Sequence, residues 1–330
     1  MKGLWFLGNR LAQALLTVLG VLVLSFLLVR LAPGDPALLM AGEAGSDDPH
    51  YIEQLRVQMG LDRPLASQLL TYVGKVIRLD LGYSYRNQSD VWILIAERLP
   101  ATLLLLGSAF LLSSLIGVGL GILAALSARR RGWLDKLIST LATLLYAAPS
   151  FWLALLLIIL FSLQLGWLPA FGMETVAASL SGWDRVVDLA RHLLLPAFTL
   201  ACLFLALYIQ LTRSSLLEVF RQEFVRTAQA KGLAPRRILF AHVLRNGLLP
   251  VVTFAGLQLG QLASASLLVE VVFAWPGIGR LLYDALSHRD YPLLLGVFLV
   301  ISVLVVLLNL LTDSLCQWLD PRIQAGGGQA

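Results

Sequence analysis

Residues 101–126 read ATLLLLGSAFLLSSLIGVGLGILAAL and contain no charged side chain. A hydrocarbon core roughly 30 Å thick is crossed by about 20 helical residues, so this stretch is long enough to span a bilayer. The rest of the chain has the same character, since 58% of its 330 residues are hydrophobic and only 14% are charged. These proportions exclude an ordinary soluble protein. We therefore expect an all-α, polytopic helical membrane protein.

Six apolar blocks pass the length test, and we expect six transmembrane helices in a single domain that covers residues 1–330. The blocks occupy approximately residues 9–31, 101–126, 137–161, 192–215, 247–270 and 292–317. The first block follows Lys2 and Arg10, as a signal peptide would, but it is longer than the apolar region of a signal peptide. No A-x-A cleavage site follows it, so we expect an uncleaved span.

The segments between the blocks alternate in charge. The second-to-third segment holds four bases and one acid, and residues 213–245 hold seven bases and two acids. Residues 33–100 hold six bases and nine acids, while the segments near 166–191 and 270–291 each hold two bases and three acids. Because cytoplasmic loops are rich in Lys and Arg, both termini are predicted to be cytoplasmic. The net charge of +5 is also explained better by basic segments that orient the chain in the membrane than by nucleic-acid binding.

Residues 33–100 form the largest predicted outer segment. They mix turn signals with one amphipathic run around Ile52 and Leu55 and another from Leu69 to Ile77. We expect a small, ordered helical insertion outside the membrane.

Several local features are predicted to be structural. The Ala-Pro-Ser sequence at 148–150 interrupts the third block and indicates a packing kink rather than a gating hinge. The glycines within 117–121 indicate close helix packing. Glu270 and Asp313 lie near span ends, where an acid can stay hydrated. The two cysteines, Cys202 and Cys316, are far apart and do not suggest a disulfide framework or a metal site.

The segment 216–246, between the fourth and fifth blocks, is predicted to contain a short amphipathic helix. From Leu216 the sequence LLEVFRQEFVRTAQAKG places apolar side chains at three- and four-residue spacing. These side chains are Leu217, Phe220, Phe224 and Ala228.

The end of this helix is marked by Gly232, which suits a left-handed position past the last turn, and by Pro235, which prevents continuation. A new helix is predicted from Arg236. Two interpretations of the amphipathic helix remain open. It can lie on the inner leaflet, which periodicity alone favours, or its apolar stripe can dock in a groove of a cytoplasmic partner.

The sequence RTAQAKGL at 226–233, with HVLRN at 242–246 and Leu249-Pro250, resembles the dipeptide, oligopeptide and nickel permeases of binding-protein-dependent ABC importers. Of the general Glu-Ala-Ala, three residues, Gly pattern of such permeases, Ala228 and Gly232 match. Further segments agree along almost the whole chain. They are PGDP (33–36), GLDRP (60–64), DLG (80–82), LPAT (99–102), TRSSLLE (212–218), FAWPGIGR (273–280), RDYP (289–292) and DPR (320–322).

The resemblance implies a type I ABC importer permease fold in the cell inner membrane. PGDP and the long insertion resemble the B-type subunit, whose implied partners are a homologous C-type permease, two cytoplasmic ATPase subunits, an extracytoplasmic substrate-binding protein and membrane lipid. ATP and magnesium would bind the ATPase subunits, and this chain would hold no cofactor. The implied ATPase-coupling residues are Leu217, Phe220, Phe224, Arg226, Thr227, Ala228 and Gly232. Peptides are the implied substrate, with nickel or metal chelates left open.

Other functions make different demands on the sequence. The chain has no G-x-x-x-x-G-K-[ST], so it is not predicted to hydrolyse ATP. An ion-coupled transporter or channel would place acids or His within its spans, which are nearly free of ionisable groups. A membrane scaffold remains a third possibility.

We expect Trp275 to be an interfacial aromatic and Arg289-Asp290 to be a charged stop before the sixth span.

Overall fold

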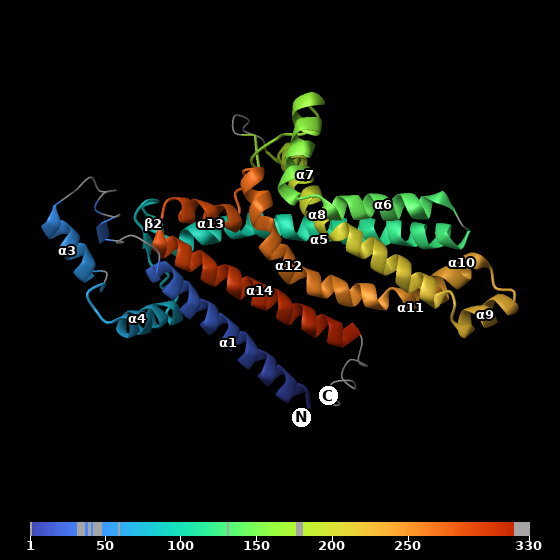
Figure 1. Ribbon diagram of the computed structural model, residues 1–330, viewed down its shortest axis with the longest axis horizontal. Coiled ribbons are helices and arrows are strands. Elements are labelled where there is room, and N and C mark those ends of the chain that lie inside the picture. Colours follow the sequence, from blue (N-terminus) through green and yellow to red (C-terminus); the bar gives the residue numbers. More distant parts are fainter. Residues whose placement is uncertain are drawn as a thin grey trace. The chain divides into compact units, whose positions relative to one another are not determined.

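The computed structural model of the chain describes residues 2–31, 37–38, 41, 48–58, 60–130, 132–175 and 181–319. The motifs PGDP and DPR lie outside the described residues, as do the side chains of Asp313 and Cys316. Helices make up most of the described chain (Figure 1), which confirms the all-α prediction.

The elements follow one another along the chain with one small β-hairpin between α4 and α5. The helices are α1 (Lys2–Leu31), α3 (Pro49–Gln58), α4 (Leu65–Ile77), α5 (Val91–Arg129), α6 (Trp133–Ala147), α7 (Ser150–Leu157), η1 (Ile158–Gln164), α8 (Trp183–Val219), α9 (Glu223–Ala230), α10 (Pro235–Arg237), η2 (Ile238–Leu244), α11 (Arg245–Gly247), α12 (Leu249–Val272), α13 (Ile278–Ser287) and α14 (Tyr291–Leu319). The antiparallel strands are β1 (Tyr83–Ser84) and β2 (Ser89–Asp90). The segments η1 and η2 are π-helical.

Four helices among the described residues are long and apolar enough to cross a membrane: α5, α8, α12 and α14 up to Thr312. A fifth span results if α6 and the α7–η1 segment are counted as one bent helix. The described apolar part of α1, Ala12–Leu28, is shorter than these spans. The total of six therefore stays a prediction.

The third predicted span is interrupted more sharply than expected. The segment from Ser150 to Gln164 bends by 107° from α6. Pro149 disfavours helical geometry in the residue before it, and Ala148 has extended backbone angles with ψ of 131°. The predicted interruption at 148–150 is therefore confirmed, and the helix ends and restarts at this point. The packing role of the break stays a prediction.

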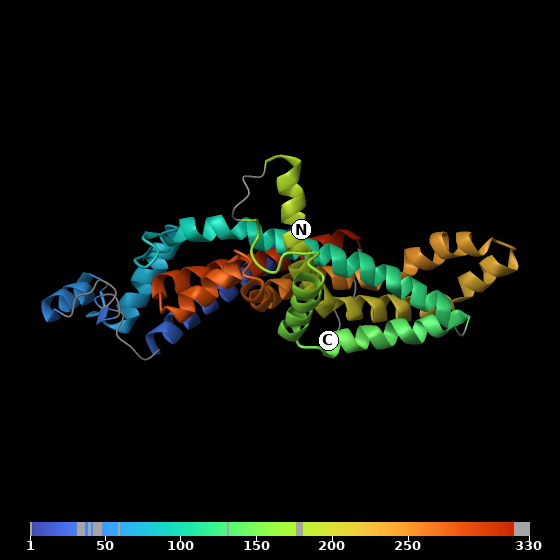
Figure 2. The same ribbon diagram turned by 90° about the horizontal axis from the view of Figure 1, so that it is seen from above.

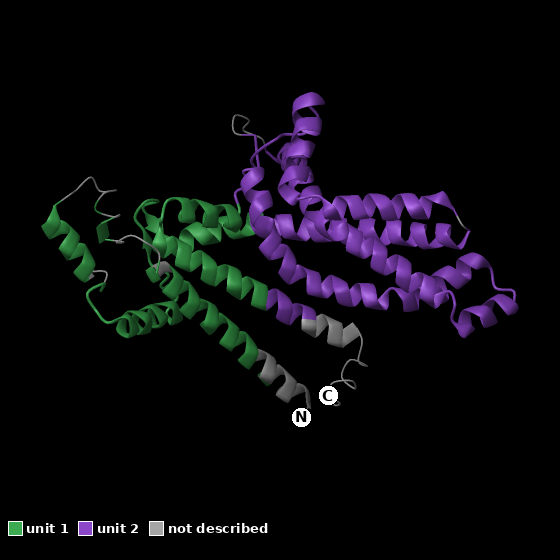
Figure 3. Ribbon diagram, in the orientation of Figure 1, with its two compact units in different colours: residues 1–101, 277–306 green, residues 102–276, 307–330 purple. Residues whose placement is uncertain are grey.

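The chain divides into two compact units, which Figure 3 colours separately. The first unit comprises residues 1–101 and 277–306. Within it, part of the predicted outer insertion forms a small core of Ala37, Ala41 and Leu55. Helix α5 begins at Val91, within the predicted insertion, and the bounds of the insertion stay a prediction.

Asp290, predicted as a charged stop, is the N-cap of α14. One of its carboxylate oxygens accepts a hydrogen bond from the backbone N–H of Leu293 at 3.2 Å. The other accepts one from the hydroxyl of Ser84, in β1, at 2.5 Å. The carboxylate therefore satisfies the helix start and attaches the β-hairpin to it.

The second unit comprises residues 102–276 and 307–330. In it α6 packs alongside α8, as Figure 2 shows, and α12 also packs on α8. Helix α5 approaches α8 closely, since a Cβ added at Gly117 would lie 2.4 Å from that of Tyr208, and one at Gly121 would lie 2.6 Å from that of Thr212. The predicted close packing is confirmed for these two glycines, whereas Gly119 faces open space.

The turn after α12 buries two residues that were predicted near the membrane surface. Glu270 is fully buried, and the hydroxyl of Thr102 donates a hydrogen bond to its carboxylate at 2.9 Å. Trp275 is also fully buried, and its backbone N–H donates to the Glu270 carbonyl at 2.8 Å. The prediction of a hydrated acid is therefore wrong, because the turn folds Glu270 into the protein. The depth of Trp275 relative to the membrane surface stays a prediction.

Candidate functional site

The loop between α8 and α12 begins with a break in the predicted amphipathic helix. Helix α8 ends at Val219, and α9 starts at Glu223 after a short turn. The backbone N–H of Gln222 donates to the Val219 carbonyl at 3.1 Å and so closes this turn. The single helix predicted over residues 216–232 is therefore wrong, because two helices share that stretch.

Burial of apolar side chains accounts for the break. The turn lets α9 fold back so that apolar residues of α5, α8, α9 and η2 share one small core, which we call the hairpin core. Its buried members are Ala125, Leu216, Val225, Ala228, Ile238 and Val243. A continuous helix would carry Val225 and Ala228 away from Leu216, so the apolar contacts favour the folded-back arrangement. We call α9 and residues 235–247 together the loop hairpin.

Phe220 fixes the turn between the two helices. It packs against the hairpin core, and the guanidinium carbon of Arg129 lies 4.1 Å from the centre of its ring. A cation over an aromatic face stabilises such a contact by about 0.5–1 kcal/mol at an exposed site. The end of α5 is thereby attached to the end of α8.

Gly232 ends α9 as predicted. Its φ is +72°, in the left-handed region, and its N–H donates to the Gln229 carbonyl at 2.9 Å. The N–H of Leu233 donates to the Ala228 carbonyl at 3.3 Å. These two bonds form a Schellman motif, which satisfies carbonyls at the end of a helix. Pro235 then opens α10, one residue earlier than the predicted restart.

Three of the predicted coupling residues lie on the exposed side of α9. Phe224 leaves 42% of its surface exposed, and Arg226 and Thr227 are also exposed. Arg226 forms an ion pair with Glu223 at 2.9 Å, but both side chains are mostly exposed, so the pair contributes less than about 1 kcal/mol. We call Phe224, Arg226 and Thr227 the outer face of α9.

The remaining predicted coupling residues have supporting positions. Ala228 is buried in the hairpin core, Leu217 and Phe220 pack against that core, and Gly232 terminates the helix. Val225 and Leu216 were not predicted, although each lies one residue from a member of the predicted stripe. The apolar stripe is therefore used within the protein, and only Phe224 of the apolar set keeps a large exposed surface.

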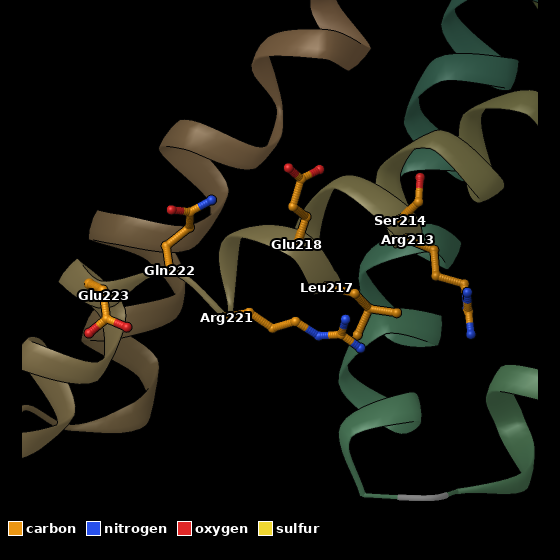
Figure 4. Close-up of a pocket in the computed structure, with 7 residues that line it drawn as sticks. All are labelled: Arg213, Ser214, Leu217, Glu218, Arg221, Gln222 and Glu223. Atoms are coloured by element: carbon orange, nitrogen blue, oxygen red, sulfur yellow. The ribbon is translucent and has the colours of Figure 1, made fainter.

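A surface cavity of about 530 Å³ lies at the turn between α8 and α9 (Figure 4). Its lining is mostly polar and consists of Arg213, Ser214, Leu217, Glu218, Arg221, Gln222 and Glu223. Figure 4 shows the side chain of Arg221 extending from the turn toward Leu217. Charges of both signs make this cavity suited to polar groups.

Arg213, on one wall of this cavity, forms a bidentate ion pair with Asp135 in the first turn of α6. Planar, two-bond pairs of this kind fix orientation as well as contributing energy. This pairing was not predicted from the sequence, although Asp135 is the one acid in the basic second-to-third segment. In the described part of the chain, no group of three His, Cys, Asp or Glu side chains is arranged to hold a metal ion.

The comparisons with known proteins cover both the loop hairpin and the remainder of the chain. A family model described as "Binding-protein-dependent transport system inner membrane component" matches residues 117–325. The chain belongs to this family. A second model, for the N-terminal part of such components, matches residues 3–106. This inner membrane component is accordingly a multi-pass protein, as the apolar helices require.

Relatives of known name match this inner membrane component over nearly its full length. The di/tripeptide transport system permease protein DppB of Pseudomonas aeruginosa is 40% identical over 97% of this chain and 98% of that protein. The dipeptide permease DppB of Escherichia coli K12 is 37% identical over 97% and 99%, respectively. A putative peptide transport permease of Brucella abortus is 40% identical over 96% and 98%.

A solved structure shares the fold. The inward-facing MetNI methionine ABC transporter matches with a TM-score of 0.54 and 16% identity, over 69% of this chain and 97% of that chain. The predicted ABC importer permease fold is thereby confirmed.

Proposed function

We propose that this chain is the B-type permease subunit of an ATP-driven, binding-protein-dependent importer of di- and oligopeptides. The observation that carries the proposal is the 40% identity to a di/tripeptide permease over 97% of this chain, loop hairpin included. The named relatives above are peptide permeases, which favours peptides over nickel or metal chelates.

The importer is proposed to contain this subunit, a homologous C-type permease, two cytoplasmic ATPase subunits and an extracytoplasmic binding protein. ATP and magnesium bind the ATPase subunits. The excess of bases in residues 213–245 supports a cytoplasmic position for the loop hairpin and for both termini. The binding protein then delivers peptide from the side of residues 33–100.

The outer face of α9 is proposed to dock on an ATPase subunit. Phe224 offers an apolar anchor, and Thr227, three residues on, offers a polar contact beside it. Arg226 adds an exposed basic group elsewhere on the helix surface. The hairpin core supports this role because it joins α9 to the ends of α5 and α8, so a displacement of α9 is passed to both spans. The ATPases shift the conformational equilibrium only through contacts that differ between the conformations.

The test is reconstitution of the complete importer in proteoliposomes with its binding protein. We expect labelled dipeptides to accumulate only with ATP, and mass spectrometry to identify peptides bound to the purified binding protein. A binding protein that carries nickel or a chelate, with no dipeptide uptake, would overturn the proposed substrate. Uptake driven by an ion gradient without the ATPases would overturn the proposed class of transporter.

A further inference from the structure

Helix α4 (Leu65–Ile77) presents an apolar stripe that the described part of its own unit leaves uncovered. Leu70 and Ile77 lie two turns apart on the same side of the helix, and they leave 73% and 77% of their surfaces exposed. Val73 lies between them on that side. Large apolar side chains gathered in this way mark an interaction surface.

An aromatic contact attaches α4 near one end of α1. The ring of Tyr72 stacks on that of Phe26, with 5.9 Å between centroids and 22° between planes. Phe26 precedes Leu31, the last residue of α1, by about 8 Å along the axis at 1.5 Å per residue. The guanidinium of Arg30 lies over the same ring, 5.5 Å from its centre.

This position corresponds to the depth of a helix in a membrane interface. Such helices bury their apolar side about 5–10 Å into the boundary between headgroups and acyl chains. If α1 is the first span, a contact about 8 Å from its outer end places α4 within that layer. Tyr and Arg, which combine an apolar body with a polar tip, are typical of the same layer.

The charges on α4 select the kind of lipid. Within the helix the one charged residue is Lys75, and the residue that caps its C-terminus is Arg78. Both side chains are exposed, and α4 itself contains no acid. Basic side chains beside an apolar stripe suit anionic phosphates at a bilayer surface.

We propose that α4 is an interfacial helix that lies in the outer leaflet, with Leu70 and Ile77 among acyl chains and Lys75 and Arg78 at lipid phosphates. The choice of the outer leaflet rests on the membrane orientation given under the proposed function. The inference that α4 contacts lipid does not depend on that orientation. The attachment to α1 at this depth favours lipid over the binding protein, which approaches from the aqueous side.

Fluorescence quenching in the assembled importer tests the proposal. Leu70→Cys and the neighbouring Thr71→Cys, each in a chain with Cys202→Ser and Cys316→Ser, are labelled with an environment-sensitive dye. Thr71 is exposed and lies about 100° around the helix from Leu70, so it is the matched control. In vesicles that contain phosphatidylglycerol, we expect brominated acyl chains to quench the label at Leu70 about threefold more than the label at Thr71. Iodide in the aqueous phase should instead quench the label at Thr71 more than the label at Leu70.

Equal quenching of both labels by iodide would overturn the proposal, because the stripe would then face water. Protection of the Leu70 label from both quenchers would also overturn it and would indicate a protein partner. Lys75→Glu with Arg78→Glu should reduce acyl-chain quenching at Leu70 in phosphatidylglycerol vesicles, and no change would refute the role of anionic lipid. Loss of dipeptide uptake with normal quenching at Leu70 would count against the proposed function alone.

Discussion

The guanidinium of Arg213 on α8 donates hydrogen bonds to both carboxylate oxygens of Asp135 on α6, at 2.5 and 2.8 Å. The two residues are 78 positions apart in sequence. Arg213 also lines the cavity at the turn before α9. The pair therefore joins the cytoplasmic end of α8, as proposed above, to the start of α6.

Removing this pair should reduce stability by a modest amount. Arg213→Lys keeps the charge but loses the planar two-bond contact, and we expect it to lower the thermal unfolding temperature of the purified permease. The side chains are 33% and 14% exposed, so a double-mutant cycle with Asp135→Asn should give a coupling energy of about 1 kcal/mol. Purely additive effects in that cycle would show that the planar two-bond contact adds nothing beyond the charge that Lys retains.

Adjacent residues on α9 should behave differently when each is changed to Asp. Val225 is fully buried in the hairpin core, so Val225→Asp should prevent stable folding of the loop hairpin, at a cost of several kcal/mol for an unpaired buried charge. Phe224 is 42% exposed, so Phe224→Asp should leave the permease folded and inserted. With Phe224→Asp, we expect ATP-dependent uptake to fall at least tenfold, which corresponds to about 1.4 kcal/mol of lost coupling. Normal uptake by a correctly assembled Phe224→Asp importer would contradict docking through the outer face of α9.

Substitutions at Gly232 should follow backbone geometry rather than side-chain size. No atom lies within 4 Å of a Cβ built at this position, but its φ is +72°. Gly232→Asn should be tolerated best, Gly232→Ala should cost about 1 kcal/mol, and Gly232→Pro should cost most because it also removes the donated hydrogen bond. Thermal unfolding and ATP-dependent uptake can rank the three variants. If Gly232→Ala were tolerated as well as Gly232→Asn, the left-handed conformation at Gly232 would be contradicted.

The glycines of α5 offer a matched pair for testing helix packing. A Cβ at Gly121 would lie 2.9 Å from the backbone oxygen of Ile209, so α5 and α8 would have to move apart. We expect Gly121→Ala to destabilise the protein by about 1–3 kcal/mol. Gly119→Ala should be neutral or should stabilise it by up to about 1 kcal/mol, because the site is open and Ala favours a helix. Unfolding in detergent measures both, and similar effects at the two sites would rule out this packing.

The helical class and the end of α9 could be predicted because they depend on local chemistry. Apolar block length decides whether a segment can cross lipid, and Gly232 with Pro235 limits where a helix can end. The partner of the apolar stripe in 216–232 could not be predicted in the same way. Periodicity places Phe224 and Ala228 on one side of a helix, but it does not say whether that side meets a partner or the protein itself.

The sequence alone determined the helical membrane class and the end of α9 at Gly232, since hydrophobic length and backbone constraints act within a short stretch of chain. Tertiary structure alone decided that α8 stops at Val219, that Val225 and Ala228 face inward, and that Arg213 meets Asp135. It also decided that Glu270 is buried against Thr102. These outcomes depend on contacts between residues distant in sequence, whose burial and hydrogen bonds outweigh the local preference for a continuous helix or a hydrated acid.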